Sequence, residues 1–518
     1  MSEPNELTMK FISDLNAIRD IRAIEVKRDE EMEKLHISTT GAIISGFYEN
    51  LRKAGENAEE NMLLTRAIRR FLKRFFLVGS NLNSSNVGEE LITDLTLAGY
   101  LRNDSITISK AAEIDRTIRT YATTHRKLHA KFSGEVADRW AMETLAVAID
   151  SELVDHRVTM AFIDFVYNYF LKSIDRNALF QNNPPASFEA ILFAAVQKTL
   201  LKYDNATIRL NILTRYQVSP SRTVDFAKLN AQIDQIFDDP ALDKLTHTID
   251  RNAAPFRIFL KVLSDDNLAK YLESEKAFLG VFTPMIDRSY TSIRKDVSRG
   301  VVRSAILLLI PKLFRVIYDI HSDITSGGSI NWLPLIVNLC PVIYMFALRL
   351  TLFMPNSNNS RALTRDMTRI LFEPVPSQPT IGRDRHRKFG ITYNVVYGMI
   401  VIAAFGGIGY VLWNMVGFSW VRIGTFFIYI SMASFLGFRL SRKIREVEVG
   451  SEHQNGLTVL RDFIYMPFVV VGRKISEVYS QLNIVSTLLD MLVELPFKTI
   501  LKFVRQWSNF LSDKKDSF

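Results

Sequence analysis

The sequence predicts an all-α protein in which a large helical domain precedes a group of membrane-spanning helices. Alternation of polar and apolar residues with a period of two is scarce, so strands are not expected. Charged residues crowd into the first 300 positions, and long apolar runs occur only after them. We therefore expect three parts: a cytoplasmic α-helical domain (1–300), a four-helix transmembrane region (301–440) and a cytoplasmic or interfacial helical tail (441–518).

The overall composition is ordinary, but it restricts the surroundings of the protein. Of its 518 residues, 47% are hydrophobic and 23% charged, which are soluble-protein averages that hide the segregation along the chain. The net charge of +9 indicates a polyanionic neighbour, either anionic lipid or nucleic acid. The single cysteine, Cys340, excludes an intramolecular disulfide. The first 20 residues have no apolar core, so we expect no cleavable export signal.

The first domain is expected to be a series of helices separated by turns. The breaks "QNNPPAS", "QVSPSRT" and "FDDPALD" are rich in proline and polar residues. In the last of these, Asp238 and Asp239 before Pro240 predict a turn and a helix cap.

A basic amphipathic helix is predicted within this domain by "NMLLTRAIRRFLKRFFLVG", residues 61–79. Its apolar positions lie opposite its cations, which are Arg66, Arg69, Arg70, Lys73 and Arg74. We keep three interpretations: packing on its own domain with the basic side facing lipid, insertion into the membrane interface, and nucleic-acid binding. The segregation of aromatic from basic residues disfavours nucleic acid and makes these five cations candidate contacts of anionic headgroups.

Four apolar runs predict the transmembrane region. They cover residues 304–320, 332–354, 391–415 and 419–438. A helix needs about 20 mostly apolar residues to cross a bilayer, and the last three runs meet this length with little charge. The first run is short and contains Lys312, Arg315 and Asp319, which share one helical face. We expect it to span with that face turned inward; a helix lying flat in the headgroups is the alternative.

The distribution of basic residues predicts the orientation. The segments after the second and fourth runs are rich in arginine and lysine, which places them in the cytoplasm by the positive-inside rule. The first domain and both ends of the chain then lie in the cytoplasm. The tail contains "NIVSTLLDMLVELPFKTILKFVRQWSNFL", which predicts either an interfacial amphipathic segment or a helix docked on the first domain.

Parts of the sequence are similar to those of a family of uncharacterised bacterial multi-helix membrane proteins. The similar segments are "RSAILLLIPKLFRVIYDI", "NWLPLIVNLCPVIYMFALRLTLFMP", "RDFIYMPFVVVGRKIS", "NIVSTLLDMLVELPFKTILKFVRQW" and, in the first domain, "EELITDLTLAGYLRNDSI". None of these is a catalytic signature. The resemblance implies a place in the membrane of a bacterium and implies no activity.

The sequence offers no constellation for an enzyme, a cofactor or a metal. It contains no phosphate-binding glycine motif of the Walker or dinucleotide type. His125 and His129 have ligand spacing, but two of the three residues between them are basic and the metalloprotease glutamate is missing. "GGIG" at 406–409 lies inside an apolar run, where helix packing explains it better than phosphate binding.

The functional candidates are therefore polar groups within the apolar runs, because an intramembrane polar group is functional by default. They are Lys312, Arg315, Asp319, Asn338 and Arg349. We expect a multi-pass inner-membrane protein that acts as a non-enzymatic scaffold or assembly protein, with membrane lipids and a protein partner or second copy as its partners. The alternative is a component of an oligomeric transporter or channel.

Overall fold

The computed structural model describes residues 3–37, 62–77, 86–325, 332–352, 354–374, 381, 391–449 and 465–477. Helices make up its secondary structure, and two isolated bridges are the only β-type pairings in the described part. The all-α prediction is therefore confirmed. In chain order the helices are α1 (Glu6–Glu30), α3 (Leu63–Leu77), α4 (Val87–Leu97), α5 (Ile108–His129), α6 (Gly134–Ala137), the π-helix η2 (Asp138–Met142), α7 (Glu143–Leu153), α8 (Arg157–Ser173), α9 (Arg176–Phe180), α10 (Phe188–Leu200), α11 (Asn205–Arg215), α12 (Thr223–Asp238), α13 (Pro240–Asn252), α14 (Ala254–Leu260), α15 (Leu268–Leu272), α16 (Glu275–Thr325), α17 (Trp332–Leu350), α18 (Ser357–Phe372), α19 (Ile391–Asn414) and α20 (Trp420–Arg445).

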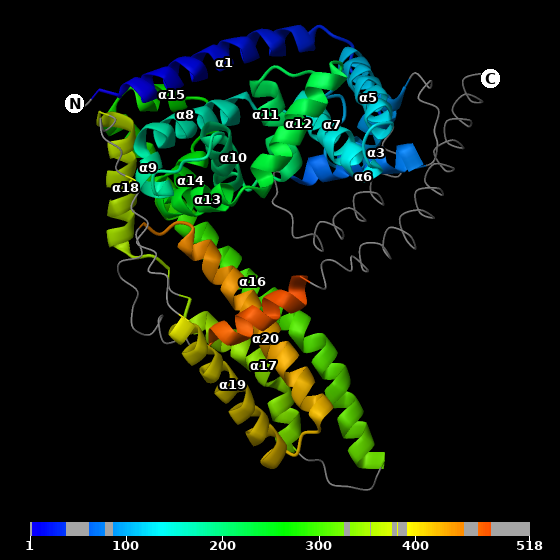
Figure 1. Cartoon of the computed structure of the whole chain (residues 1–518), viewed down its shortest axis with the longest axis vertical. Helices are drawn as coiled ribbons and strands as arrows, with labels where there is room; N and C mark the ends of the chain where they lie inside the picture. Colours follow the sequence, from blue (N-terminus) through cyan, green and yellow to red (C-terminus); the bar gives the residue numbers. More distant parts are fainter. Residues whose placement is uncertain are drawn as a thin grey trace, which may run out of the picture.

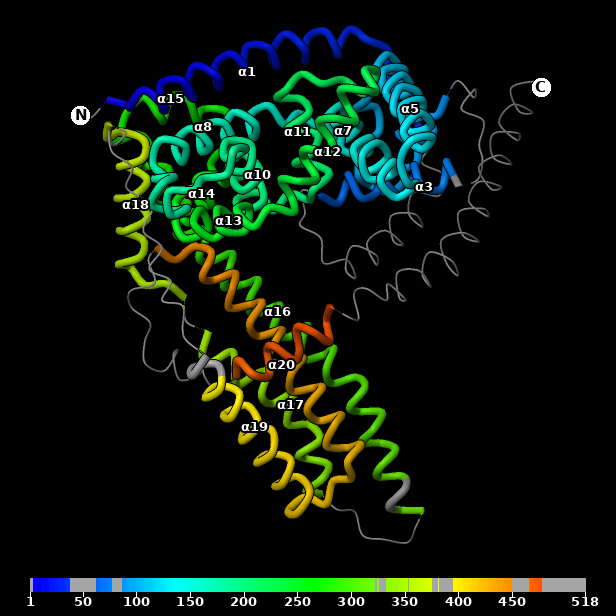
Figure 2. Tube along the Cα trace, viewed as in Figure 1, coloured from blue at the N-terminus to red at the C-terminus, as the bar shows by residue number. Residues whose placement is uncertain are grey.

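Two groups of helices are visible in Figure 1. We call the first the body: α1 to α15, the first part of α16, and α18. We call the second the bundle: the last part of α16 with α17, α19 and α20, which extends away from the body (Figure 2). Helix α1 lies across the face of the body farthest from the bundle.

The body is built around one large aromatic and aliphatic core. Phe162, Phe170, Phe193 and Phe259 are among its fully buried side chains. Side chains from outside the first 300 residues join this core, including Leu363 and Met367 of α18. The segment after the second apolar run, which the sequence describes only as a basic loop, therefore contains a helix that completes the body.

Local sequence explains where several helices begin. The Asn5 side chain caps α1, accepting a hydrogen bond from the Thr8 backbone N–H at 3.0 Å. The cap predicted before Pro240 is confirmed, because Asp239 Oδ1 accepts from the Ala241 N–H at 2.8 Å. Both side chains satisfy N–H groups that have no partner within the helix.

Helix α16 joins the two groups of helices in one element of 51 residues. Phe278, Phe282 and Ile286 near its start are buried in the body core. Val301 and Leu308 are buried in the bundle, against residues of α17 and α20. The predicted boundary at residue 300 thus falls within a continuous helix.

The prediction of four spanning helices is confirmed for three of them by length and composition. The described part of the chain contains three helices long and apolar enough to cross a membrane: α17, residues 395–414 of α19, and α20. The run 304–320 does not qualify by composition, because it carries three charged side chains within the last part of α16.

Part of the tail is helical and packs on the bundle. Residues 465–477 form a helix whose Gly472 lies directly against the Ser431 carbonyl of α20. The rest of the predicted tail, residues 450–464 and 478–518, lies outside the described residues, and so does its interfacial or docked placement.

Candidate functional site

Lys312 joins three helices inside the bundle. Its side chain is only 3% exposed. Nζ donates a hydrogen bond to Asn338 Oδ1 of α17 at 2.7 Å and lies 4.3 Å from the centre of the Tyr429 ring of α20. A cation on a ring face is attracted by the ring quadrupole, so two uncharged partners hold this ammonium group.

Asp319 forms a second polar cluster two helical turns farther along α16. Its Oδ1 is 3.2 Å from Arg315 Nε on the same helix and 3.2 Å from Arg422 Nη2 on α20. The sequence places Arg315 and Asp319 on one face, and the structure adds Arg422. Sequence reasoning missed Arg422, although it lies at the start of an apolar run, where intramembrane charge would have indicated it.

The two clusters hold more cations than anions. The clusters contain three cations, Lys312, Arg315 and Arg422, and one carboxylate, that of Asp319, which pairs with Arg315 and Arg422. The Asn338 Nδ2 atom is also buried, without a hydrogen-bond partner among the described residues. An unpaired buried donor costs about 1–3 kcal/mol, so the site contains one donor, Asn338 Nδ2, that lacks an acceptor among the described residues.

Arg349 does not belong to these clusters. It lies in the last turn of α17, 11 residues after Asn338, which is about 16 Å along the helix. Its side chain is exposed, whereas Lys312 is enclosed. The structure therefore brings together four of the five predicted polar residues of the apolar runs as two neighbouring clusters and separates the fifth.

The opposite face of the last part of α16 is apolar and exposed. Phe314 is 72% exposed, although it lies only two residues from the buried Lys312. Other large apolar side chains share this exposure, namely Ile306, Leu307, Ile310, Ile317 and Tyr318. Around Lys312 and Asp319, α16 thus turns polar groups inward and large apolar side chains outward, the reverse of a helix on a water-soluble protein.

The predicted basic amphipathic helix is α3, and both of its faces contact the body. On the apolar face of this helix, Ile68 and Leu72 are buried in the body core. On the basic face, Arg69 pairs with Asp204 at 3.0 Å and Arg74 with Asp94 at 2.8 Å. The apolar face is therefore occupied by protein in this structure, while headgroup contact by the cations stays a prediction.

His125 and His129 lie side by side, with ring centres 5.9 Å apart. His125 Nε2 is 2.7 Å from Asp138 Oδ1. No group of three metal-ligating side chains occurs within the described ranges. Within these ranges, His125 therefore has a carboxylate partner, and the two histidines belong to no group of metal-ligating side chains.

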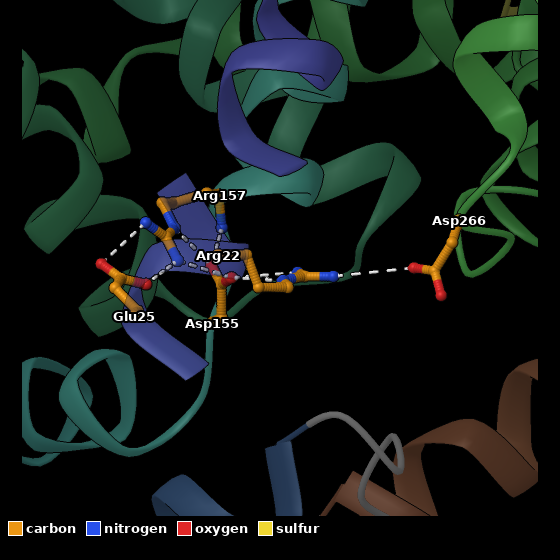
Figure 3. Close-up of polar contacts among 5 residues, drawn as sticks. All are labelled: Arg22, Glu25, Asp155, Arg157 and Asp266. Carbon is orange, nitrogen blue, oxygen red and sulfur yellow. Dashed lines mark hydrogen bonds and ion pairs between the residues drawn. The ribbon is translucent and has the colours of Figure 1, made fainter. Parts of the chain in front are cut away.

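A groove beneath α1 carries a network of ion pairs that sequence reasoning missed (Figure 3). Arg22 of α1 pairs with Asp155 at 2.9 Å and lies 3.9 Å from Asp266, while Arg157 contacts both Asp155 and Glu25. Hydrogen bonds from Arg157 hold the pKa of Asp155 well below its usual range. The cavity has a volume of about 340 Å³ and is partly open. Both arginines of the network pair with carboxylates, so the network fastens α1 to α8.

Comparison of the chain with protein-family models, with curated proteins and with solved structures found no match.

Proposed function

We propose that this chain is a multi-pass protein of a bacterial inner membrane, with the bundle in the lipid and the body in the cytoplasm. The main support is the outer surface of the bundle, where α17 and α20 expose large apolar side chains. Only 6% of the apolar part of α19 is buried in protein. Such surface is stable in a bilayer and is an aggregation hazard in water.

The last part of α16 is proposed as a fourth crossing helix. Residues 303–325 would be about 34 Å long, enough for the hydrocarbon core. A lone charge at mid-bilayer costs roughly 2.5–3.5 kcal/mol or more, which disfavours a crossing helix with three charges between residues 312 and 319. Here Lys312 and Asp319 point inward to polar partners on the neighbouring helices, which offsets much of that cost.

The proposed orientation rests on the end of the bundle nearest the body. Basic residues occur there on α16, α17 and α20, and the positive-inside rule assigns such ends to the cytoplasm. Both ends of the chain are then cytoplasmic as well.

The function that this geometry supports best is a non-enzymatic scaffold or assembly protein. The single observation behind it is the continuity of α16, which is buried in the body core at its start and in the bundle farther on. A continuous helix fixes the position of the body relative to the membrane. Its partners would be lipid and either another protein or a second copy of the chain.

The second candidate function is a component of an oligomeric transporter or channel. The buried ammonium group of Lys312, beside an Asn338 donor without a partner, is the observation that favours it. With so few crossing helices in one chain, a pathway would require several copies.

Cysteine labelling in intact cells tests the membrane placement. After replacement of Cys340 by alanine, Met415→Cys and Val224→Cys offer two sites of similar exposure, 73% and 75%. Met415 lies at the end of α19 far from the body, and Val224 lies on the body. A membrane-impermeant maleimide should label Met415→Cys in intact cells and Val224→Cys only after lysis. Labelling of Val224→Cys in unbroken cells would overturn the orientation.

Flux into reconstituted vesicles separates the two functions. Because the cluster has surplus cations, chloride with an enclosed chloride-sensitive dye is a suitable probe. The scaffold proposal expects wild-type vesicles to match empty ones, and expects Lys312→Leu and Asp319→Leu to leave function intact. The alternative expects flux that Lys312→Leu abolishes and that Lys295→Leu, an exposed position on the same helix outside the bundle, preserves.

A further inference from the structure

At the end of the bundle nearest the body, three helices come into close contact at one depth along the bundle axis. A Cβ added to Gly300 of α16 would lie 2.5 Å from Leu440 Cδ2 of α20. One added to Gly437 of α20 would lie 2.7 Å from Leu348 Cδ1 of α17. These two contacts place the surroundings of residues 300, 348 and 437–440 at the same depth along the bundle.

Four exposed cations lie within one helical turn of this level: Arg303, Arg349, Arg439 and Lys443. We call these four residues the belt. They come from all three helices that pack at this depth. None of their side chains makes an ion pair or hydrogen bond with another described residue, in contrast to Arg69 and Arg74 of α3. The belt therefore presents exposed charge from three helices of the bundle.

Nearby carboxylates do not neutralise the belt. Asp296 is 3.3 Å from Arg299, and Glu446 is 3.0 Å from Lys202 of the body. Both acidic groups thus already have cationic partners. The belt remains a region of positive charge at the surface.

The depth of the belt matches that of a phosphate layer. Moving away from the body, the exposed surface becomes apolar within one or two turns, at Ile306 on α16 and at Phe346 on α17. Toward the body on α16, the exposed residues Arg294, Lys295, Asp296 and Arg299 are all charged. Long basic side chains at such a boundary place their stems on apolar surface and their charges among headgroups.

We propose that the belt binds the phosphate groups of anionic phospholipids in the leaflet that faces the body. This rests on the membrane placement proposed above and assigns a specific lipid site to it. The negative potential of an anionic leaflet attracts basic residues next to a membrane, at about 1 kcal/mol each, which is about fivefold in affinity. The belt, rather than α3, is then the main electrostatic contact with the membrane.

The test uses the full chain purified in detergent, with phosphatidylglycerol added in mixed micelles. Native mass spectrometry and the midpoint of thermal unfolding report bound lipid. The variant R303Q/R349Q/R439Q/K443Q removes the belt charges. The matched control R116Q/R119Q/R126Q/K127Q removes four exposed cations from α5 in the body, so both variants carry the same net charge. We expect phosphatidylglycerol affinity to fall at least tenfold in the belt variant and to stay within twofold of wild type in the control.

A charge-preserving variant, R303K/R349K/R439K/K443R, guards against a general folding defect and should retain most of the affinity. Three results would overturn the proposal: unchanged affinity in the glutamine variant, equal affinity for phosphatidylcholine, or equal stabilisation by inorganic phosphate without lipid. Fractionation of cell membranes keeps the two proposals distinct. Wild-type chain in the soluble fraction refutes the membrane placement itself, whereas a membrane-bound chain with no lipid preference refutes only the belt.

Discussion

The carboxylate of Glu152 on α7 lies in an unusual environment for an acidic residue of the body. Its Oε1 accepts a hydrogen bond from Thr117 Oγ1 at 2.6 Å, and its Oε2 is buried with no partner among the described residues. Burial raises the pKa of this carboxyl, and the hydrogen bond from Thr117 opposes that rise only in part. The folded protein therefore holds this proton to a higher pH than the unfolded chain, whose value is about 4.3.

Glu152→Gln should change the pH dependence of stability in a defined direction. Because the pKa is higher in the folded state, wild type loses stability as the pH rises from about 4.3 through the raised value. The glutamine keeps the acceptor for Thr117 and does not titrate, so the variant should gain stability relative to wild type over that window. Midpoints of thermal unfolding of both proteins between pH 4 and 8 measure the difference. If the midpoints of the two proteins changed in parallel with pH, the raised pKa of Glu152 would be contradicted.

At the scale of residues, the sequence predicts which polar groups share a helical face but not what they meet. The spacing of Lys312, Arg315 and Asp319 is sufficient to place them together. Their partners Asn338, Arg422 and Tyr429 lie 26 to more than 100 positions away along the chain. Which polar groups come together depends on the packing of α17 and α20, which the local pattern does not contain.

At the scale of elements, the helix at residues 465–477 depends on one glycine. A Cβ added to Gly472 would lie 2.1 Å from the Ser431 carbonyl oxygen and 2.8 Å from Phe435 Cβ. The first of these is a backbone atom, which a rotamer change cannot move. Gly472→Ala must therefore separate this helix from α20.

We expect Gly472→Ala to destabilise the protein by about 1–3 kcal/mol, the usual cost of overpacking. Gly424→Ala on α20 is the matched control, because no atom lies within 4 Å of its added Cβ. Alanine is the better helix former, so the control should be neutral or slightly stabilising. Thermal unfolding in detergent compares the two variants, and equal effects would show that the contact at Gly472 does not stabilise the protein.

Elements with a strong local signal were predicted, and those defined by tertiary contact were not. The apolar runs at 332–354, 391–415 and 419–438 correspond to α17, α19 and α20, since length and composition alone identify such helices. Helix α18 was not predicted, because its arginines led us to interpret the segment only as a basic cytoplasmic loop. Its apolar residues Leu363, Met367 and Leu371 recur at helical spacing and are buried in the body core. The basic faces of α3 and α18 look alike in sequence, and only the structure shows what each apolar face meets.

At the scale of the whole molecule, the body and the bundle are connected by more than one helix. Helix α16 passes through both cores. The end of α20 returns to the body, where Val447 is buried in its core and Glu446 pairs with Lys202 at 3.0 Å. Ile293, between the two regions of α16, packs against both cores. The rotation of α16 relative to the body is therefore fixed at both ends.

A single alanine inserted after Lys295 tests this coupling. The insertion rotates the rest of α16 by about 100° and advances it by 1.5 Å. Lys312 would then turn from Asn338 toward lipid, and Val301 would leave the contact with α17 and α20. Because α20 is itself attached to the body, the bundle cannot follow the rotation. An unpaired charge at mid-bilayer costs roughly 2.5–3.5 kcal/mol or more, so we expect the insertion to lower stability by at least that amount.

The matched control is one alanine inserted after Asn183, in an exposed turn of the body. Size-exclusion elution and thermal unfolding of the purified proteins compare the insertions, and the control should resemble wild type. If the insertion after Lys295 were equally tolerated, the two parts of α16 would be independent. The scaffold proposal would then lose its support, because a body that turns freely on its membrane anchor presents no fixed surface to a partner.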